Sequence, residues 1–207
     1  MMPSIHLRLL LAVTLALVAF LGLGSFALDK AFSDSLERAA EERLLGYVYA
    51  LLGAAKTDTE GRMRLPGSLP DPRFSNPDSG LYAWVLGEDG NYRWHSLSMV
   101  GRPVKPLEVV KAGSHSFSYE ESAGGSFYLL VFGLLWEDDA GKELSYSFAI
   151  AENDAAIQAQ VSTFRESLLV WLGGVSVILL MLQGLVLSWG LRPLRQVSSG
   201  LKRIESG

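Results

Sequence analysis

Two long uncharged apolar runs bracket this chain and constrain its fold more than any other feature. Residues 9–28 contain no charged side chain over 20 positions, and residues 167–191 contain none over 25. A helix of about 20 residues crosses the hydrocarbon core of a bilayer, so each run predicts a transmembrane helix. The polar middle, residues 29–166, is long enough for one domain with its own core. Segments 1–8 and 192–207 form the two ends.

The charges sort by region. Residues 29–166 carry 21 acidic and 13 basic side chains, whereas the flanks carry five Lys or Arg and a single Glu. Cytoplasmic flanks of membrane proteins are rich in Lys and Arg. We therefore expect a bacterial inner-membrane protein with both termini in the cytoplasm and the middle domain in the periplasm. The acidity of the middle domain argues against nucleic acid as a partner.

The first apolar run has a competing interpretation as a cleaved signal peptide. Ser25-Phe26-Ala27 is a small-x-small triplet of the kind that a signal peptidase accepts. The run is longer than the usual h-region of about 7–15 residues, which favours an uncleaved anchor. The chain has no cysteine, and this excludes a lipoprotein anchor, thiol catalysis and cysteine-based zinc sites.

The middle domain reads as α+β. Apolar residues at spacings of three and four predict one helix over residues 29–55, continuous with the first span. Alternating and aromatic-rich segments with turn residues between them predict an antiparallel sheet, and Asn153 is a plausible N-cap for a helix that continues into the second span. A long N-terminal helix packed on such a sheet indicates a PAS-like (PDC-type) sensor domain. The expected strands are 81–86, 92–97, 114–121, 127–137 and 142–151.

The C-terminal segment predicts a short amphipathic helix. Leu194, Val197, Leu201 and Ile204 follow the 3-4-3 spacing of a coiled-coil seam, and Pro193 falls in the first turn, where a missing N–H is tolerated. This pattern indicates the first helix of a cytoplasmic HAMP-like linker. A positively charged stop-transfer tail is the alternative.

Three stretches carry a family resemblance: YAWVLGEDGNYRWHS at 82–96, TFRE at 163–166 leading into LGG at 172–174, and WGLRPL at 189–194. With the overall layout, they resemble two-component sensor histidine kinases of the PhoQ type. The resemblance implies a homodimer that senses a periplasmic divalent cation, acidity or cationic peptide. It also implies a kinase that uses ATP and phosphorylates a response regulator. We expect this chain to be the sensor half, not itself an enzyme, because it lacks a cytoplasmic phospho-accepting His and an ATP lid. A chemoreceptor, a diguanylate cyclase or a structural membrane protein are the competing functions.

Glu137, Asp138 and Asp139 are the candidate metal ligands. Adjacent carboxylates attract Mg²⁺ or Ca²⁺, which prefer oxygen ligands, and the resemblance implies that cations bridge such an acidic patch to membrane lipid. The alternative is a plain hairpin loop, since Asp and Gly are common turn-formers. We expect no cofactor elsewhere in the chain.

Gln183 is the one amide in the second span. A polar side chain is costly in lipid, so it should face a partner helix, and we predict a signalling role in which it bonds its dimer mate. An incidental position in a tolerant span is the alternative. His95 and His115 could titrate in mild acid, although a lone strand histidine is more often an ordinary surface residue. No catalytic constellation appears in the sequence.

Overall fold

The computed structural model describes residues 5–59, 61–87, 92–102, 110–122, 125–137, 141 and 143–190. The chain divides into two compact units: Asp34–Ala159, called here the sheet domain, and Met1–Ser33 with Gln160–Gly207, called the helix pair. Two helices, α1 (Ile5–Ala54) and α2 (Ala155–Gly190), contribute to both units. Two long apolar helices thus flank an antiparallel sheet domain, which confirms the α+β expectation.

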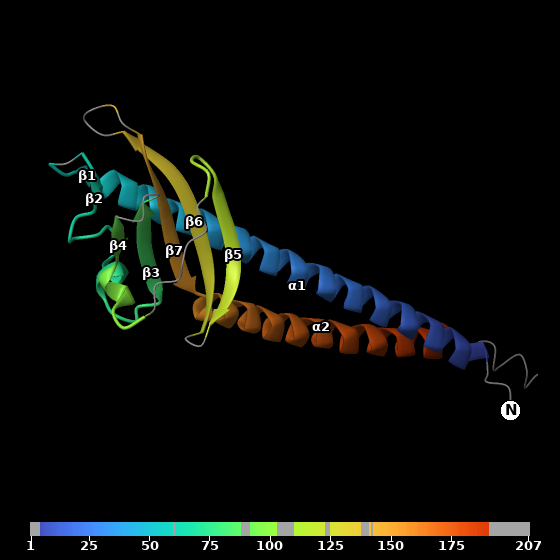
Figure 1. Cartoon of the computed structure of the whole chain (residues 1–207). Coiled ribbons are helices and arrows are strands. Elements are labelled where there is room, and N and C mark those ends of the chain that lie inside the picture. The colour runs from blue at the N-terminus through green and yellow to red at the C-terminus, as the bar shows by residue number, and fades with distance from the viewer. Residues whose placement is uncertain are drawn as a thin grey trace, which may run out of the picture. The chain divides into compact units, whose positions relative to one another are not determined.

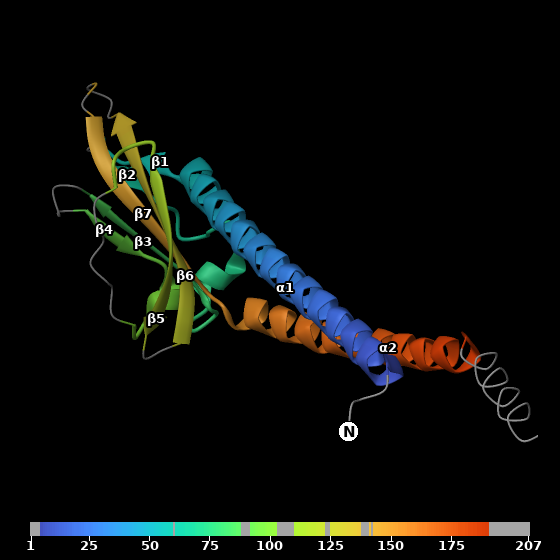
Figure 2. The ribbon, with the colours of Figure 1, turned by 90° about the vertical axis from the view of Figure 1, so that its right-hand side faces the viewer.

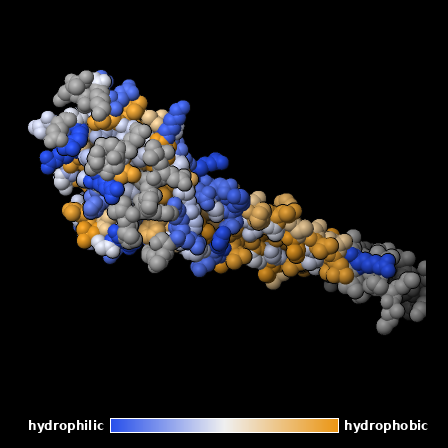
Figure 3. All heavy atoms as spheres, viewed as in Figure 1, coloured by the Kyte–Doolittle hydropathy of each residue, from blue (hydrophilic) through white to orange (hydrophobic). Residues whose placement is uncertain are grey.

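The helix pair contains the apolar runs. Each helix includes a strongly apolar stretch that is long enough to span a membrane and that is not buried inside the protein. On the face shown in Figure 3, hydrophobic residues predominate along the described part of this unit. Apolar side chains that point outward along a helix need a surrounding that is itself apolar, so both helices are long and apolar enough to cross a membrane.

The sheet domain is built on five antiparallel strands in the order β4-β3-β7-β6-β5 (Figure 1). A second sheet contains only two short strands, and two 3₁₀ turns, η1 and η2, complete the described elements. The bounds are β1 (Lys56–Thr57), β2 (Met63–Arg64), η1 (Pro72–Ser75), β3 (Leu81–Gly87), β4 (Arg93–His95), η2 (Leu97–Met99), β5 (His115–Ser122), β6 (Gly125–Glu137) and β7 (Glu143–Asn153).

The five expected strands all form, and one is shorter than predicted. The segment expected over 92–97 is extended only at Arg93–His95. Ser96 ends it, because its N–H donates to the Ala83 carbonyl at 2.8 Å while its hydroxyl accepts from the Ala83 N–H at 3.0 Å. The Ser96 hydroxyl thus takes the place of a backbone carbonyl in the strand pairing, and the backbone then turns into η2.

Helix α1 lies along one face of the sheet (Figures 1 and 2). The predicted apolar stripe is the contact: Ala40, Leu44, Val48 and Leu51 have no exposed surface. On the sheet, inward positions alternate with the pleat. The other face carries its own cluster, in which η2 contributes Met99 beside Tyr82, Trp84, Leu129, Val131, Ala149 and Ala151. Burial on both faces fixes the register of the central strands.

The end of β7 is also the start of α2. Asn153 is the last strand residue, and its Oδ1 accepts the backbone N–H of Ala155, the first helical residue, at 2.8 Å. The side chain predicted to cap the helix therefore binds its first turn, while Asp154, whose carbonyl accepts the Gln158 N–H at 2.8 Å, holds the N-cap position itself. One residue, Asp154, separates the two elements; it is buried and accepts a hydrogen bond from Tyr119 at 2.8 Å.

Gly133 allows a close crossing in the middle of β6. A Cβ at this position would lie 2.2 Å from the Val110 carbonyl oxygen and 2.7 Å from that of Lys111. The Gly113 N–H donates to the Gly133 carbonyl at 2.8 Å, and the Gly133 N–H donates to the Ser114 carbonyl at 3.0 Å. Only glycine lets the incoming chain lie this close to the strand.

Candidate functional site

A network of charged and polar side chains joins α1, η1 and β7 within the sheet domain. Glu152 of β7 is buried, and its two carboxylate oxygens accept from different arginines. Arg43 of α1 donates through Nε to Oε2 at 2.8 Å, and Arg73 of η1 donates through Nη1 to Oε1 at 3.0 Å. Arg73 also donates to Asp71 at 3.1 Å and to the hydroxyl of Tyr47. Two carboxylates and two guanidinium groups leave the network with balanced charge.

The network shifts the pKa values of several of its members, Asp71 and Tyr47 among them. Burial by itself would raise the pKa of the Asp71 carboxyl, but hydrogen bonds from the side chain and backbone N–H of Arg73 lower it below its ordinary value. Burial raises the pKa of the Tyr47 hydroxyl, which the charge of Arg73 opposes only in part. At neutral pH Asp71 is therefore ionised and Tyr47 is protonated.

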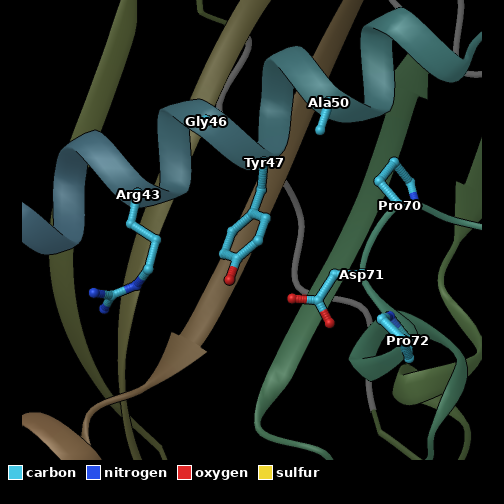
Figure 4. Close-up of a pocket in the computed structure, with 7 residues that line it drawn as sticks. All are labelled: Arg43, Gly46, Tyr47, Ala50, Pro70, Asp71 and Pro72. Atoms are coloured by element: carbon cyan, nitrogen blue, oxygen red, sulfur yellow. The ribbon is translucent and has the colours of Figure 1, made fainter.

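An open cavity of about 570 Å³ lies between α1 and the segment that leads into η1 (Figure 4). In Figure 4 the Asp71 carboxylate and the Tyr47 hydroxyl point toward one another across it. Gly46 leaves the helix surface bare here, because a Cβ at that position would meet nothing within 4 Å. The charged groups are directed at one another, which favours a role in holding α1 to η1. The lining residues are Arg43, Gly46, Tyr47, Ala50, Pro70, Asp71 and Pro72.

Of the three candidate metal ligands, the structure describes only Glu137. It is exposed at the end of β6 and pairs directly opposite Glu143 of β7. Asp138 and Asp139 lie outside the described residues. Among the residues that are described, no three His, Asp or Glu side chains gather as a metal site would require. The cation hypothesis at this hairpin therefore stays a prediction.

The structure likewise describes only one of the predicted signalling residues. Pro193, Leu194, Val197, Leu201 and Ile204 lie beyond the described range, so the HAMP-like helix stays a prediction. Gln183 is described, and its Nε2 donates to the backbone carbonyl of Leu10 at 3.1 Å. The amide therefore has a partner in the other helix of the same chain.

The two histidines of the sheet domain lie on edge strands. His95 is exposed on β4, and His115 is on β5. The Nε2 atom of His115 lies 2.9 Å from the Glu41 carboxylate of α1. His115 thus links an edge strand to the helix, and no further structural role follows for His95.

Sequence reasoning missed the network around Glu152, although one signal pointed to it. Leu144, Tyr146, Phe148 and Ile150 alternate along β7, and Glu152 is the next position on the same inward face. A carboxylate at a predicted core position needs a charged partner. The partners come from α1 and η1, far away in sequence, so the pattern could indicate a buried ion pair without identifying Arg43 or Arg73.

Two apolar helices that are long enough to span a membrane and that flank one antiparallel sheet domain are the layout of a two-span membrane protein. Over 207 residues the chain is 31% identical to the two-component sensor PhoQ of Pseudomonas aeruginosa, a match that covers all of this chain and 46% of that protein. No protein-family model and no solved structure matches. Along its whole length the chain is therefore similar to a PhoQ-type two-component sensor, and it spans about half the length of the curated relative.

Proposed function

We propose that this chain is the sensing and transmembrane portion of a two-component histidine kinase. The observation that carries the proposal is the similarity to a two-component sensor along the whole chain, through both helices and the sheet domain. In this proposal the sheet domain lies in the periplasm and both termini lie in the cytoplasm. The signal is a divalent cation, acidity or a cationic peptide.

In this proposal, the domain that produces the output signal is not part of residues 1–207. Residues 192–207, with the seam Leu194, Val197, Leu201 and Ile204 after Pro193, would relay the signal as the first HAMP helix. A kinase beyond Gly207 would bind ATP and phosphorylate a response regulator. A chemoreceptor or diguanylate cyclase output is the alternative on the same plan. Sequencing the gene beyond codon 207 separates them: a helix bearing a His followed by an acidic residue supports a kinase, and another output domain contradicts it.

The acidic hairpin is the proposed cation site. Glu137 and Glu143 face each other across β6 and β7, and like charges directly opposite destabilise a strand pair. Asp138 and Asp139 follow in sequence and add to the negative charge. A Mg²⁺ or Ca²⁺ ion would relieve this repulsion and could bridge the hairpin to anionic lipid headgroups. A hairpin loop without metal is the competing interpretation.

A calorimetric titration of the chain in lipid nanodiscs tests this proposal. Mg²⁺ should bind the unmodified protein, and a triple variant with Glu137→Gln, Asp138→Asn and Asp139→Asn should bind at least about tenfold more weakly. The matched control removes three other carboxylates by Glu37→Gln, Glu121→Gln and Glu166→Gln. Equal affinities in the two triple variants would leave the hairpin without a cation role.

A second copy of the chain is the proposed partner of α1. One stripe of exposed residues runs along the helix at spacings of four and three, which is the pattern of a coiled-coil seam. Gly46 and Gly53 lie on it, and a Cβ at either would meet nothing within 4 Å. Gly46 is an exposed mid-helix glycine, which costs about 1 kcal/mol relative to alanine, and close approach by another helix would offset this cost. The stripe is Ser35, Ala39, Glu42, Gly46, Tyr49 and Gly53.

Gly46→Leu tests the dimer proposal. The new side chain has room within its own chain, so it should leave the fold intact while blocking close helix approach. We expect the dimer dissociation constant, measured by fluorescence energy transfer in nanodiscs or vesicles, to rise at least about tenfold. Glu37→Leu, on the side of α1 away from the stripe, is the control. Equal dissociation constants for the two variants would exclude this stripe as the interface.

A further inference from the structure

Asp29 and Arg165 join the two helices of the helix pair where the apolar runs end. Arg165 Nε donates to Asp29 Oδ1 at 2.7 Å, and Nη2 donates to Oδ2 at 3.0 Å. Such a two-point contact fixes orientation as well as distance, because the planar guanidinium matches the carboxylate. In the sequence, Asp29 is an ordinary charged residue beside a span, and Arg165 is noticed only as part of the TFRE stretch at 163–166.

An aromatic contact lies one turn from this ion pair. The rings of Phe32 and Phe164 stack at 4.1 Å between centroids, with 17° between their planes. Phe32 follows Asp29 by three residues on α1, and Phe164 directly precedes Arg165 on α2. Residues three apart lie on the same helix face, so the ion pair and the ring stack act on one stretch of the contact between α1 and α2.

We propose that Asp29 and Arg165 are positioning residues which, with the Phe32–Phe164 stack, clamp α2 to α1 of the same chain. The clamp makes the two spans move together, so that a signal displaces the pair as one body. The competing arrangement is α2 sliding along α1. The inference deepens the proposed sensor function, because it states how the spans of one chain respond.

The strength of these contacts fits a reversible clamp. Exposed ion pairs are individually weak, and an aromatic pair adds a contribution of comparable size. Their sum shifts a two-state equilibrium by roughly tenfold, which is enough to favour one arrangement without preventing the other. Removing only the ion pair should reduce the ratio of clamped to unclamped helix ends by roughly two- to fivefold.

Electron paramagnetic resonance on the full chain in nanodiscs tests the clamp. The chain has no cysteine, so Ala31→Cys and Gln160→Cys, both at exposed positions, place two unique spin labels on α1 and α2. The unmodified pair should give one narrow distance distribution. Asp29→Asn and Arg165→Gln should each broaden it and add a longer distance, and the swap of Asp29→Arg with Arg165→Asp should restore it.

The control is Glu166→Gln, which removes a neighbouring exposed charge on α2 and should leave the distribution unchanged. Unfolding temperatures should be equal across these variants, so that a change in distance reports position and not loss of fold. If Asp29→Asn and Arg165→Gln both match Glu166→Gln, the clamp is overturned. Adding Mg²⁺ separates this inference from cation sensing, because clamped spans keep the same distance whether or not the cation is the signal. A label distance that Mg²⁺ lengthens in the unmodified pair would mean that α2 slides along α1, and would overturn the clamp without contradicting the cation signal.

Discussion

Helix α1 is held by different forces in the two units through which it passes. In the sheet domain, four side chains with no exposed surface fasten it to the strands: Ala40, Leu44, Val48 and Leu51. In the helix pair, apolar side chains point outward, as Phe20 does at 75% exposure. There the contacts with α2 include an ion pair, a ring stack and the Gln183 bond. Water drives apolar burial in one unit, whereas lipid supplies no such force in the other.

Leu44→Ala should give the largest loss of stability. Leu44 is fully buried against the sheet, and deleting a buried leucine costs about 2–5 kcal/mol because a cavity remains. Chemical denaturation of the chain in detergent, followed by tryptophan fluorescence, measures the loss. Leu169→Ala is the control on α2, since Leu169 is 68% exposed and its removal should cost less than about 0.5 kcal/mol. Similar losses for both variants would break the comparison between the two units.

Gly133→Ala should be nearly as damaging, although it adds only a methyl group. The new Cβ would overlap backbone oxygens that cannot turn away, and overpacking costs about 1–3 kcal/mol. The same denaturation experiment measures it. Gly67→Ala, where the added Cβ meets nothing within 4 Å, should be neutral. A harmless Gly133→Ala would mean that the crossing segment is not held against β6.

Glu152→Gln should cost about 1.5–3 kcal/mol, the range for hydrogen bonds to charged groups. Arg43 and Arg73 would keep an amide oxygen in place of a carboxylate and lose their charge partner. Glu37→Gln, at an exposed position on the same helix, is the control and should change stability by less than about 0.5 kcal/mol. Because Glu152 is buried and Asp29 is exposed, this result sharpens the contrast between ion pairs in the two units.

The smallest effect is a change in the pH dependence of stability. The pKa of Asp71 is lower in the folded protein than in the unfolded chain, so the unfolded state binds more protons in the window between the two values. Stability from this group is therefore complete above the ordinary aspartate pKa and is lost as the pH falls through the folded value. Unfolding midpoints in acid should drop less steeply for Asp71→Asn than for the unmodified chain. If the unfolding midpoints of the two proteins fall equally with pH, Asp71 does not contribute to the loss of stability in acid.

The sequence predicts elements better than it predicts the contacts between elements. Charge-free runs, apolar spacing and the Asn153 cap depend on neighbouring residues, and they identify both long helices and all five strands. The pairing of Glu152 with Arg73, and of Asp29 with Arg165, joins residues 79 and 136 positions apart. Nothing local specifies such partners, since each charged residue has several possible mates on the folded surface.

The shortened strand β4 shows that contacts between neighbouring strands are also hard to predict from sequence. Residues 92–97 have the composition of a strand, yet Ser96 bonds Ala83 through both its backbone and its hydroxyl and ends the strand. The competition between side chain and ladder is decided by the position of β3. Only the assembled sheet supplies that position.

Asn153 connects strand β7 to helix α2 without a flexible linker. It belongs to strand β7, and it also caps the first turn of α2, with Asp154 alone in between. A flexible linker would absorb a small displacement of the strand, because its dihedral angles could rotate freely. Here the strand ladder, the buried Asp154 and the cap fix those angles. A shift of β7 along its own axis therefore displaces the first turn of α2 by the same amount. Inserting two glycines after Asn153 would create a flexible linker that absorbs this displacement.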